Sequence, residues 1–236
     1  MPRTNEFGQP IGPDLAGWTP PPVPPAEEMV GRTVTLQPLD RARHAPALFD
    51  ACRDAPGSLF TYLSFGPFTT VDEVGAVINA QNSAPGWQPY AIVVDGTVLG
   101  FASYLRIDPA NGTIEIGSIL FSPRLQRTTA ATEALYLMIR NAFGLGYRRC
   151  EWKCDDLNAP SRAAALRLGF RYEGTFVNAT HYKGRSRDTA WYAITDDRWP
   201  ALDDSYRAWL ATDNFDADGN QRRPLAAPAQ TLAVRE

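Results

Sequence analysis

Residues 113–146 read TIEIGSILFSPRLQRTTAATEALYLMIRNAFGLG. The stretch 113–121 is rich in β-branched and apolar residues and predicts a strand. From Thr129 onward, large apolar residues recur at helical spacing, which predicts a core-facing helix that ends near Gly144. A further strand is predicted at 148–154. The order strand, helix, strand implies a right-handed crossover between two parallel strands at the centre of a sheet.

Before this crossover, the sequence predicts strands joined by tight turns. They are expected at residues 34–38, 90–94 and 98–107. The pairs Asp95-Gly96 and Asn111-Gly112 favour the positive φ that hairpin turns require. Two helices are expected at 42–52 and 71–82, the second capped by Thr70. The first half of the sheet is therefore expected to be antiparallel.

The remaining elements complete the expected fold. After the crossover we expect a short helix at 159–168, strands at 170–176 and 188–194, and a closing helix at 199–210. The fold class is therefore α/β in the α+β sense. We expect a mixed central sheet of about seven strands flanked by helices, antiparallel first and then parallel through a β-α-β unit.

Three parts of the chain differ in composition. Residues 1–30 are rich in proline and glycine and predict an extended arm, which Trp18 can pin to the domain surface. Residues 31–212 carry the strand and helix patterns and form the expected globular domain. Residues 213–236 are polar and predict a flexible C-terminal tail.

Composition excludes several classes of protein. The net charge of −3 gives no reason to expect binding to nucleic acid or to an anionic membrane. No apolar run approaches the roughly 20 residues of a membrane span, and the N-terminus does not read as a secretory signal. Cys52, Cys150 and Cys154 fit neither a disulfide framework nor a zinc site, so no metal is expected. We expect a protein of the reducing cytoplasm.

The link between the strand at 113–121 and the following helix is a candidate anion site. It is short, it contains Arg124 and Arg127, and it leads into the helix start. Unpaired N–H groups and the positive end of the helix dipole converge at such a point. The alternative interpretation is an ordinary strand–helix loop with capping threonines.

This link resembles the cofactor loop of the GCN5-related N-acetyltransferase (GNAT) superfamily, in particular its ribosomal-protein Nα-acetyltransferase branch. The family pattern Gln/Arg-x-x-Gly-x-Gly/Ala falls on residues 126–131, with Thr129 where the pattern has glycine. The resemblance implies that acetyl-CoA is the cofactor and that this loop binds its pyrophosphate. The residues it assigns to the cofactor here are Gln126, Arg127, Thr128, Thr129, Ala130, Ala131 and Thr132. We expect Thr129 to keep a helical backbone, and the hydroxyls of Thr128 and Thr129 to act as phosphate donors.

A second motif supports the resemblance. Asn158-Ala159-Pro160-Ser161-Arg162, followed by Gly169-Phe170, resembles the family's Asn-x-x-Ser…Gly-Phe signature. The resemblance implies that Asn158, Ser161 and Arg162 contribute to the cofactor site. Asn158 is also a good helix cap, and that simpler role stays open.

The family's chemistry requires a base and a polarised thioester carbonyl. Glu115 is the only carboxylate in the strand at 113–121 and lies between two isoleucines, so we expect a raised pKa and a role as base. A solvated position or a salt bridge is the alternative. The main-chain groups of Ile119, Leu120 and Phe121 are the expected partners of the thioester and pantetheine.

The proton donor to the leaving thiolate is open. Many family members carry a tyrosine four residues before the Gly-Phe pair, where this chain has Ala165. Ser161 is our candidate by analogy with the ribosomal-protein branch, and Tyr172 and Tyr182 are the others. Each has a structural role as its alternative.

The acceptor is expected to be a primary amine of a small molecule, an aminoacyl compound or a protein N-terminus. Candidate substrate-binding residues are Tyr62, Phe65, Trp87 and Trp152, which as aromatic residues can equally belong to the core. Two rival functions are a catalytically inactive CoA-binding module of the same fold and a nucleotide-dependent transferase. A homodimer is an expected assembly.

Overall fold

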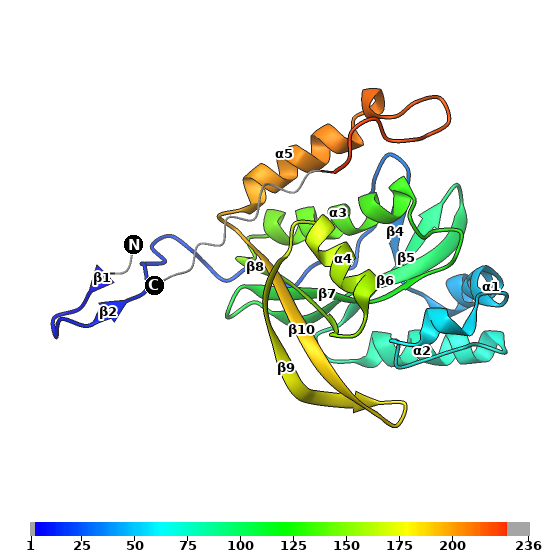
Figure 1. The fold of residues 1–236 in the computed structure, drawn as a ribbon, viewed down its shortest axis with the longest axis horizontal. Coiled ribbons are helices and arrows are strands. Elements are labelled where there is room, and N and C mark those ends of the chain that lie inside the picture. Colours follow the sequence, from blue (N-terminus) through cyan, green and yellow to red (C-terminus); the bar gives the residue numbers. More distant parts are fainter. Residues whose placement is uncertain (1–2, 226–236) are drawn as a thin grey trace.

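The computed structural model describes residues 3–225 (Figure 1). Within that range a small two-stranded sheet pairs β1 (Arg3–Thr4) with β2 (Pro10–Ile11), and a large sheet has eight strands. In chain order the large sheet contains β3 (Met29–Val30), β4 (Thr35–Pro38), β5 (Gln88–Val94), β6 (Thr97–Asp108), β7 (Thr113–Phe121), β8 (Arg149–Asp155), β9 (Arg171–Tyr182) and β10 (Arg185–Thr195). The α-helices are α1 (Arg41–Cys52), α2 (Val71–Ser83), α3 (Thr129–Gly144), α4 (Ala159–Arg167) and α5 (Trp199–Leu210).

The large sheet is mixed, as expected from the sequence. Its strand order is β3-β4-β5-β6-β7-β8-β10-β9, and every neighbouring pair is antiparallel except β7 and β8. Helix α3 makes the parallel crossover between those two strands. At the turn between β5 and β6, Asp95 and Gly96 have φ of 48° and 73°. The predicted fold class is therefore confirmed.

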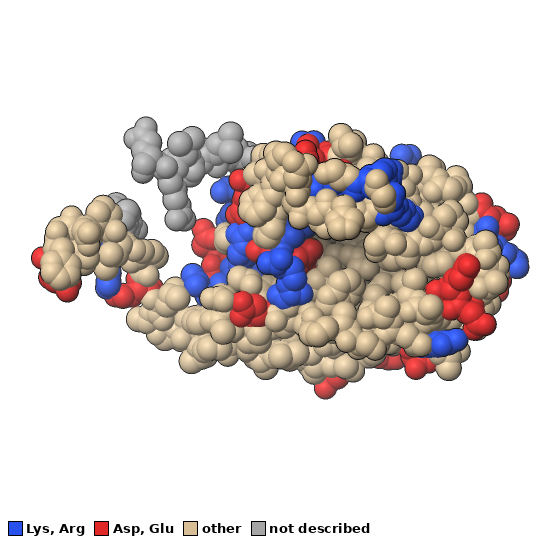
Figure 2. Space-filling view, turned by 90° about the horizontal axis from the view of Figure 1, so that it is seen from below, with Lys and Arg blue, Asp and Glu red and all other residues tan. Residues whose placement is uncertain are grey.

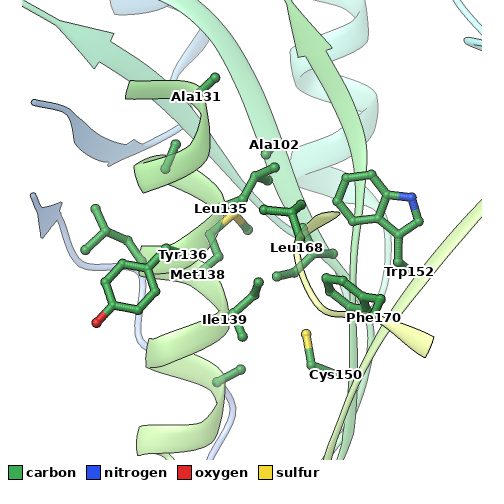
Figure 3. Close-up of a cluster of buried hydrophobic side chains, with 14 of the residues drawn as sticks. Ala102, Ala131, Leu135, Tyr136, Met138, Ile139, Cys150, Trp152, Leu168 and Phe170 are labelled. Carbon is green, nitrogen blue, oxygen red and sulfur yellow. The ribbon is translucent and has the colours of Figure 1, made fainter. Parts of the chain in front are cut away.

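Helices cover both faces of the sheet, and each face has its own core. Figure 1 shows α3, α4 and α5 on one side and α1 and α2 on the other. The larger core joins α3 to the sheet through residues such as Leu135, Met138, Trp152 and Phe170, which face one another in Figure 3. The smaller core joins α1 and α2 to β5 and β6. Successive residues of the central strands therefore point alternately into the two cores, one on each face of the sheet.

The hairpin of β9 and β10 is longer than the sequence pattern predicted. Tyr182 pairs with Arg185, so Lys183 and Gly184 form a two-residue turn, with φ of 48° and 71°. Most of β9 is exposed, including the side chains of Tyr172, Phe176 and Val177, and it lacks the apolar alternation that marks a half-buried strand. The outer part of β9 therefore forms because it hydrogen-bonds to β10, and its own sequence did not predict a strand there.

The two terminal segments contact the domain. In the N-terminal arm, the Trp18 indole N–H donates to the carbonyl of Gly146 at 3.4 Å, and the Arg148 guanidinium lies 5.5 Å from the ring centroid. The β1–β2 hairpin stands clear of the body in Figure 1. Beyond α5, Asn214 is fully buried and Leu225 is almost so. Asn214 and Leu225 thus anchor the described part of the predicted tail, although most residues between them are exposed; residues 226–236 lie outside the described range.

Among residues 3–225, every helix is too short or too polar to cross a lipid bilayer.

Candidate active site

Strands β7 and β8 run parallel and then separate from one another. Their last paired positions are Glu115 and Glu151, although β7 continues to Phe121 and β8 to Asp155. On the outer sides, β6 stays paired with β7 as far as Phe121, and β10 stays paired with β8 as far as Asp155. The facing edges therefore carry backbone groups without a ladder partner, and we call this gap the β7–β8 opening. It can bind an extended ligand that contains amides.

A bulge precedes the part of β7 that borders this opening. The register between β6 and β7 shifts near Ser118, whose φ is 47°. A bulge of this kind re-aims the backbone groups around it and increases the local twist. Ile119, Leu120 and Phe121, the residues expected to bind the thioester and pantetheine, follow directly. Their main chain lies on the strand that borders the opening.

The loop from β7 to α3 turns sharply before the helix begins. Arg127 has a φ of 62°. The Thr128 hydroxyl donates to the carbonyl of Leu125 at 2.7 Å and accepts from the Ala131 N–H at 3.1 Å, so it caps the helix. Thr129 is then the first helical residue. The left-handed position thus falls at Arg127, and threonine in place of glycine at 129 leaves the backbone unstrained.

The start of α3 retains unpaired donors. The N–H groups of Thr129 and Ala130 have no hydrogen-bond partner within the described residues, because the first turn of a helix provides none. Gln126 and Arg127 are exposed beside them. Free N–H groups, the helix dipole and a nearby cation together suit a phosphate anion. These residues therefore fit the pyrophosphate of acetyl-CoA, whereas the Thr128 hydroxyl is already used as the cap.

Three residues of this segment also have structural contacts. The side chains of Ala130 and Ala131 are buried in the larger core. The hydroxyl of Thr132 is buried and accepts a hydrogen bond from Arg167 on α4 at 3.0 Å. Thr132 therefore ties α3 to α4.

The residues at the start of α4 also occupy defined positions. Asn158 caps the helix, with its side-chain oxygen accepting from the Ser161 N–H at 3.2 Å. The Ser161 hydroxyl accepts from the Trp152 indole at 3.0 Å. Trp152 is 5% exposed and packs on Phe170, which places it in the larger core and not in an acceptor pocket. Arg162 forms an ion pair with Asp156 at 3.2 Å.

Glu115 belongs to a chain of alternating charges that crosses the sheet. Its Oε2 lies 2.8 Å from the Lys153 ammonium and 3.8 Å from the Arg106 guanidinium. Lys153 is also 2.7 Å from Glu151, which in turn pairs with Arg149. The side chains of Glu115 and Lys153 are only 8% and 7% exposed. Glu115 therefore forms the salt bridge that was the alternative to its role as base, and Lys153 is its partner.

The surroundings of Glu115 decide how readily it takes a proton. Its neighbours Ile114 and Ile116 belong to the larger core, so Glu115 faces the opposite side of the sheet. Burial raises the pKa of Glu115 above its ordinary 4.5, while Lys153 opposes that shift. The Lys153 ammonium also lies 3.7 Å from the centre of the Trp191 ring. A buried carboxylate of raised pKa can accept a proton from an amine.

The loop after α1 reaches across to the β9–β10 hairpin. This loop, residues 57–68, contains the short 3-10 helix Gly57–Phe60. The Lys183 ammonium at the hairpin turn donates to three of its carbonyls, those of Phe60, Phe65 and Gly66, at 2.9, 3.0 and 2.9 Å. We call this contact the loop–hairpin bridge. Figure 2 looks onto this side of the molecule and shows a hollow bordered by Lys and Arg side chains.

The predicted acceptor residues fall in different places. The Tyr62 hydroxyl donates to the carbonyl of Leu157 between β8 and α4, at 3.0 Å, so the loop also contacts the end of β8. Phe65 is half-buried and stacks on Phe68 in the smaller core. Trp87 lies just before β5, which is two strands away from β7. The structure therefore brings Tyr62 and Phe65 to the loop–hairpin bridge and leaves Trp87 apart.

The two tyrosine candidates for proton transfer, Tyr172 and Tyr182, differ in their surroundings. Tyr172 is about half exposed and hydrogen-bonds Thr175 on its own strand. The Tyr182 hydroxyl donates to Oδ2 of Asp155 at 2.6 Å. Burial and this carboxylate raise the pKa of Tyr182 to about 12, so it stays protonated at neutral pH. Ala165 is fully buried.

Four residues of this region were missed by sequence reasoning: Lys153, Asp155, Lys183 and Trp191. Strand alternation could have found two of them, because Lys153 and Asp155 share a face with Glu151 on β8. Lys183-Gly184 is also a readable turn signal. The pairing of these residues with Glu115, Tyr182 and the loop 57–68 depends on the sheet order and has no local signal.

Comparison with known proteins identifies the family. A model of the acetyltransferase (GNAT) domain matches residues 33–171. A crystal structure of a GCN5-related N-acetyltransferase from Brucella melitensis is 43% identical, with a TM-score of 0.86, covering 89% of this chain and 97% of that one. A GNAT-family structure from Chromobacterium violaceum is 41% identical, with a TM-score of 0.78, covering 81% and 98%. Among curated proteins, no sequence matches the chain.

A more distant structure shares the fold. It is the Salmonella typhimurium acetyl transferase that modifies the N-terminal serine of ribosomal protein L7/L12, 24% identical with a TM-score of 0.63, covering 72% of this chain and 99% of that one. The family match covers more than half of the chain and agrees with the β7–β8 opening and the unpaired helix start. The chain therefore belongs to the GCN5-related N-acetyltransferase family and is an acyl-CoA-dependent acetyltransferase.

Proposed function

We propose that this enzyme moves the acetyl group of acetyl-CoA to a primary amine by direct attack of the amine on the thioester. The observation that carries the proposal is the parting of β7 and β8 at Glu115, beside the unpaired N–H groups of Thr129 and Ala130. An extended pantetheine arm can pair with the free strand edges while the pyrophosphate binds the helix start. Ile119, Leu120 and Phe121 supply the main-chain groups along the arm.

Glu115 is the proposed base. The amine binds as an ammonium ion and loses one proton, which Glu115 accepts directly or through water. The neutral nitrogen then forms a bond to the thioester carbonyl carbon, and the carbon–sulfur bond breaks. The nitrogen loses its second proton to water, the thiolate gains one proton from its donor, which regains one from water, and the products are the N-acetyl amine and coenzyme A. A main-chain N–H of β7 stabilises the oxyanion.

Ser161 is the proposed proton donor to the thiolate. Its hydroxyl oxygen accepts from the Trp152 indole, so its own hydrogen is available for donation. The Tyr182 hydroxyl, by contrast, already donates to Asp155. Of the candidates that the sequence left open, Ser161 is therefore the one whose hydrogen bonding favours the role.

The proposal also includes the chemical class of the acceptor amine. The Salmonella relative acts on a protein N-terminus, and we propose the same class here, or a small primary amine, through a chain end that enters beside the loop–hairpin bridge. The three free, buried cysteines agree with a reducing cytoplasm. A homodimer is the proposed assembly, which light scattering in solution tests.

Two measurements test the proposed function. Acetyl-CoA at 100 times its Kd should stabilise the protein by about 2.7 kcal/mol, whereas ATP should not. Release of coenzyme A is then followed with a panel of alkylamines and N-terminal peptides. Stabilisation without turnover of any amine would favour the inactive CoA-binding module, and stabilisation by ATP alone would favour a nucleotide-dependent transferase.

A further inference from the structure

Asp155, the last residue of β8, is a buried carboxylate that the proposed mechanism leaves unused. It is 6% exposed. Its Oδ1 accepts from the Leu157 N–H at 2.9 Å, and its Oδ2 accepts from the Tyr182 hydroxyl at 2.6 Å. Within residues 3–225 no lysine or arginine lies within ion-pair distance of it. Glu115 and Glu151, in contrast, each have a cation within 2.8 Å.

The strand register places Asp155 at the level of the proposed thioester. Glu115 and Glu151 are the last paired residues of β7 and β8. Asp155 lies four residues further along β8, and the bulge at Ser118 adds one residue to β7, so Asp155 falls near the level of Ile119 and Leu120 across the β7–β8 opening. Alternation along β8 puts Asp155 on the same face as Glu151, which is the face of Glu115. Asp155 is therefore on the acceptor side of the sheet.

The hydrogen bonds of Asp155 leave capacity for a cationic ligand. A carboxylate offers about four lone-pair positions, and two are filled here by neutral donors. A buried anion without a counter-charge is costly, and an ammonium ion that binds it supplies that charge. The cations of the hairpin do not supply it. Arg185 and Arg187 pack on the Tyr182 ring, with guanidinium carbons 5.3 and 5.9 Å from its centroid.

We propose that Asp155 binds the ammonium group of the acceptor, and that the Tyr182 hydroxyl positions the carboxylate for it. The inference rests on the proposed acetyl transfer and narrows its substrate class to amines that are protonated at neutral pH. Lys153 neutralises Glu115, so Asp155 is the carboxylate whose charge remains free to attract the substrate. Amines that are neutral at this pH gain nothing from Asp155.

The test compares two acceptors with one carbon skeleton. The first is the best alkylamine of the panel, and the second is the corresponding alkoxyamine, which is uncharged at neutral pH. Asp155→Asn should lower kcat/KM for the alkylamine by about 30-fold or more, because a buried charge pair is lost. The same variant should change kcat/KM for the alkoxyamine by less than about threefold, in the range of a rearranged neutral hydrogen bond. The KM for acetyl-CoA should not change.

Tyr182→Phe is the second variant and carries the test if Asp155→Asn does not fold. It should lower kcat/KM by about fivefold for the alkylamine, the effect of one hydrogen bond, and leave the alkoxyamine unaffected. Equal losses for both acceptors, or no loss for the alkylamine, would overturn the role of Asp155 alone. A wild-type enzyme that binds acetyl-CoA yet acetylates no amine would overturn the proposed function itself.

Discussion

At the scale of single residues, the balance around Glu115 sets its chemistry. Burial disfavours the charged carboxylate and Lys153 at 2.8 Å favours it, and the net effect is a raised pKa. Lys153 is held in turn between Glu115 and Glu151 and beneath the Trp191 ring. The carboxylate is thus fixed in place while it retains some affinity for a proton, as a base requires.

This balance predicts the pH dependence of acetyl transfer. Only unprotonated Glu115 can accept the proton of the amine, so kcat/KM should fall as the pH falls through its raised pKa, above 4.5. Glu115→Gln should lower kcat by about 10²- to 10⁴-fold, the usual contribution of a general base, and should remove that acidic limb. Steady-state rates across pH measure both effects. Lys153→Met should move the limb to higher pH, and an unmoved limb would exclude Glu115 as its origin.

Thr129 provides a second prediction at this scale. Because its backbone is helical, Thr129→Gly restores the family pattern without relieving strain, and it should cost about 1 kcal/mol of folding free energy with no gain in acetyl-CoA affinity. Thr129→Val replaces only the hydroxyl, with a methyl group, and should weaken binding by about fivefold, the effect of one hydrogen bond. Calorimetric titration and thermal unfolding check both variants. Tighter binding by the glycine variant would show that threonine obstructs the phosphates.

At the scale of elements, the contact between β6 and β7 shapes the cofactor strand. A Cβ at Gly100 would lie 2.3 Å from the carbonyl oxygen of Leu120 and 2.9 Å from the Leu125 side chain. Gly100→Ala should therefore push β7 outward and cost about 1–3 kcal/mol, as other overpacked sites do. Acetyl-CoA affinity should fall as well, as measured by titration. Gly144→Ala at the end of α3 meets open space and is the matched control, expected to be neutral or slightly stabilising.

The loop–hairpin bridge is the second feature at this scale. Lys183→Met keeps the side-chain stem but removes three hydrogen bonds to the loop 57–68. Amide exchange in that loop should become about tenfold faster, because losing a charged hydrogen bond of about 1.5 kcal/mol lowers the local opening free energy. Arg185→Met, which removes one bond to Thr61, should have a smaller effect. Unchanged exchange in the loop would show that its own packing holds it closed.

At the scale of the whole molecule, Asn214 anchors the described segment after α5 to the rest of the protein. The side-chain nitrogen of Asn214 donates to the carbonyls of Trp209 and Arg223, and its oxygen accepts from the Arg223 N–H. Asn214→Ala should cost about 2–3 kcal/mol, because these buried groups lose their partner, and thermal unfolding would report it as a lower Tm. Asn220→Ala, on the exposed surface, should change stability by less than about 0.5 kcal/mol.

The fold of the whole molecule also shows which elements the sequence predicts and which it does not. The strand at 113–121, the threonine-capped start of α3 and the closing helix at 199–210 all follow from local rules of period, capping and turn geometry. The outer half of the β9–β10 hairpin and the anchoring of Asn214 after α5 did not, because neither segment has an apolar period of its own. Both are stabilised by partners distant in the chain.

The sequence by itself determined the strand, helix and strand that become β7, α3 and β8 and the threonine cap that starts α3, because period and capping depend on residues within a few positions of one another. The tertiary structure decided the rest of the site. It paired Glu115 with Lys153, 38 residues away, and Lys183 with Phe60, 123 residues away. It also put Asp155 in contact with Tyr182, 27 residues away. Such pairs follow from the order and register of the strands. Packing across the entire sheet fixes this order and register, and no local sequence pattern encodes them.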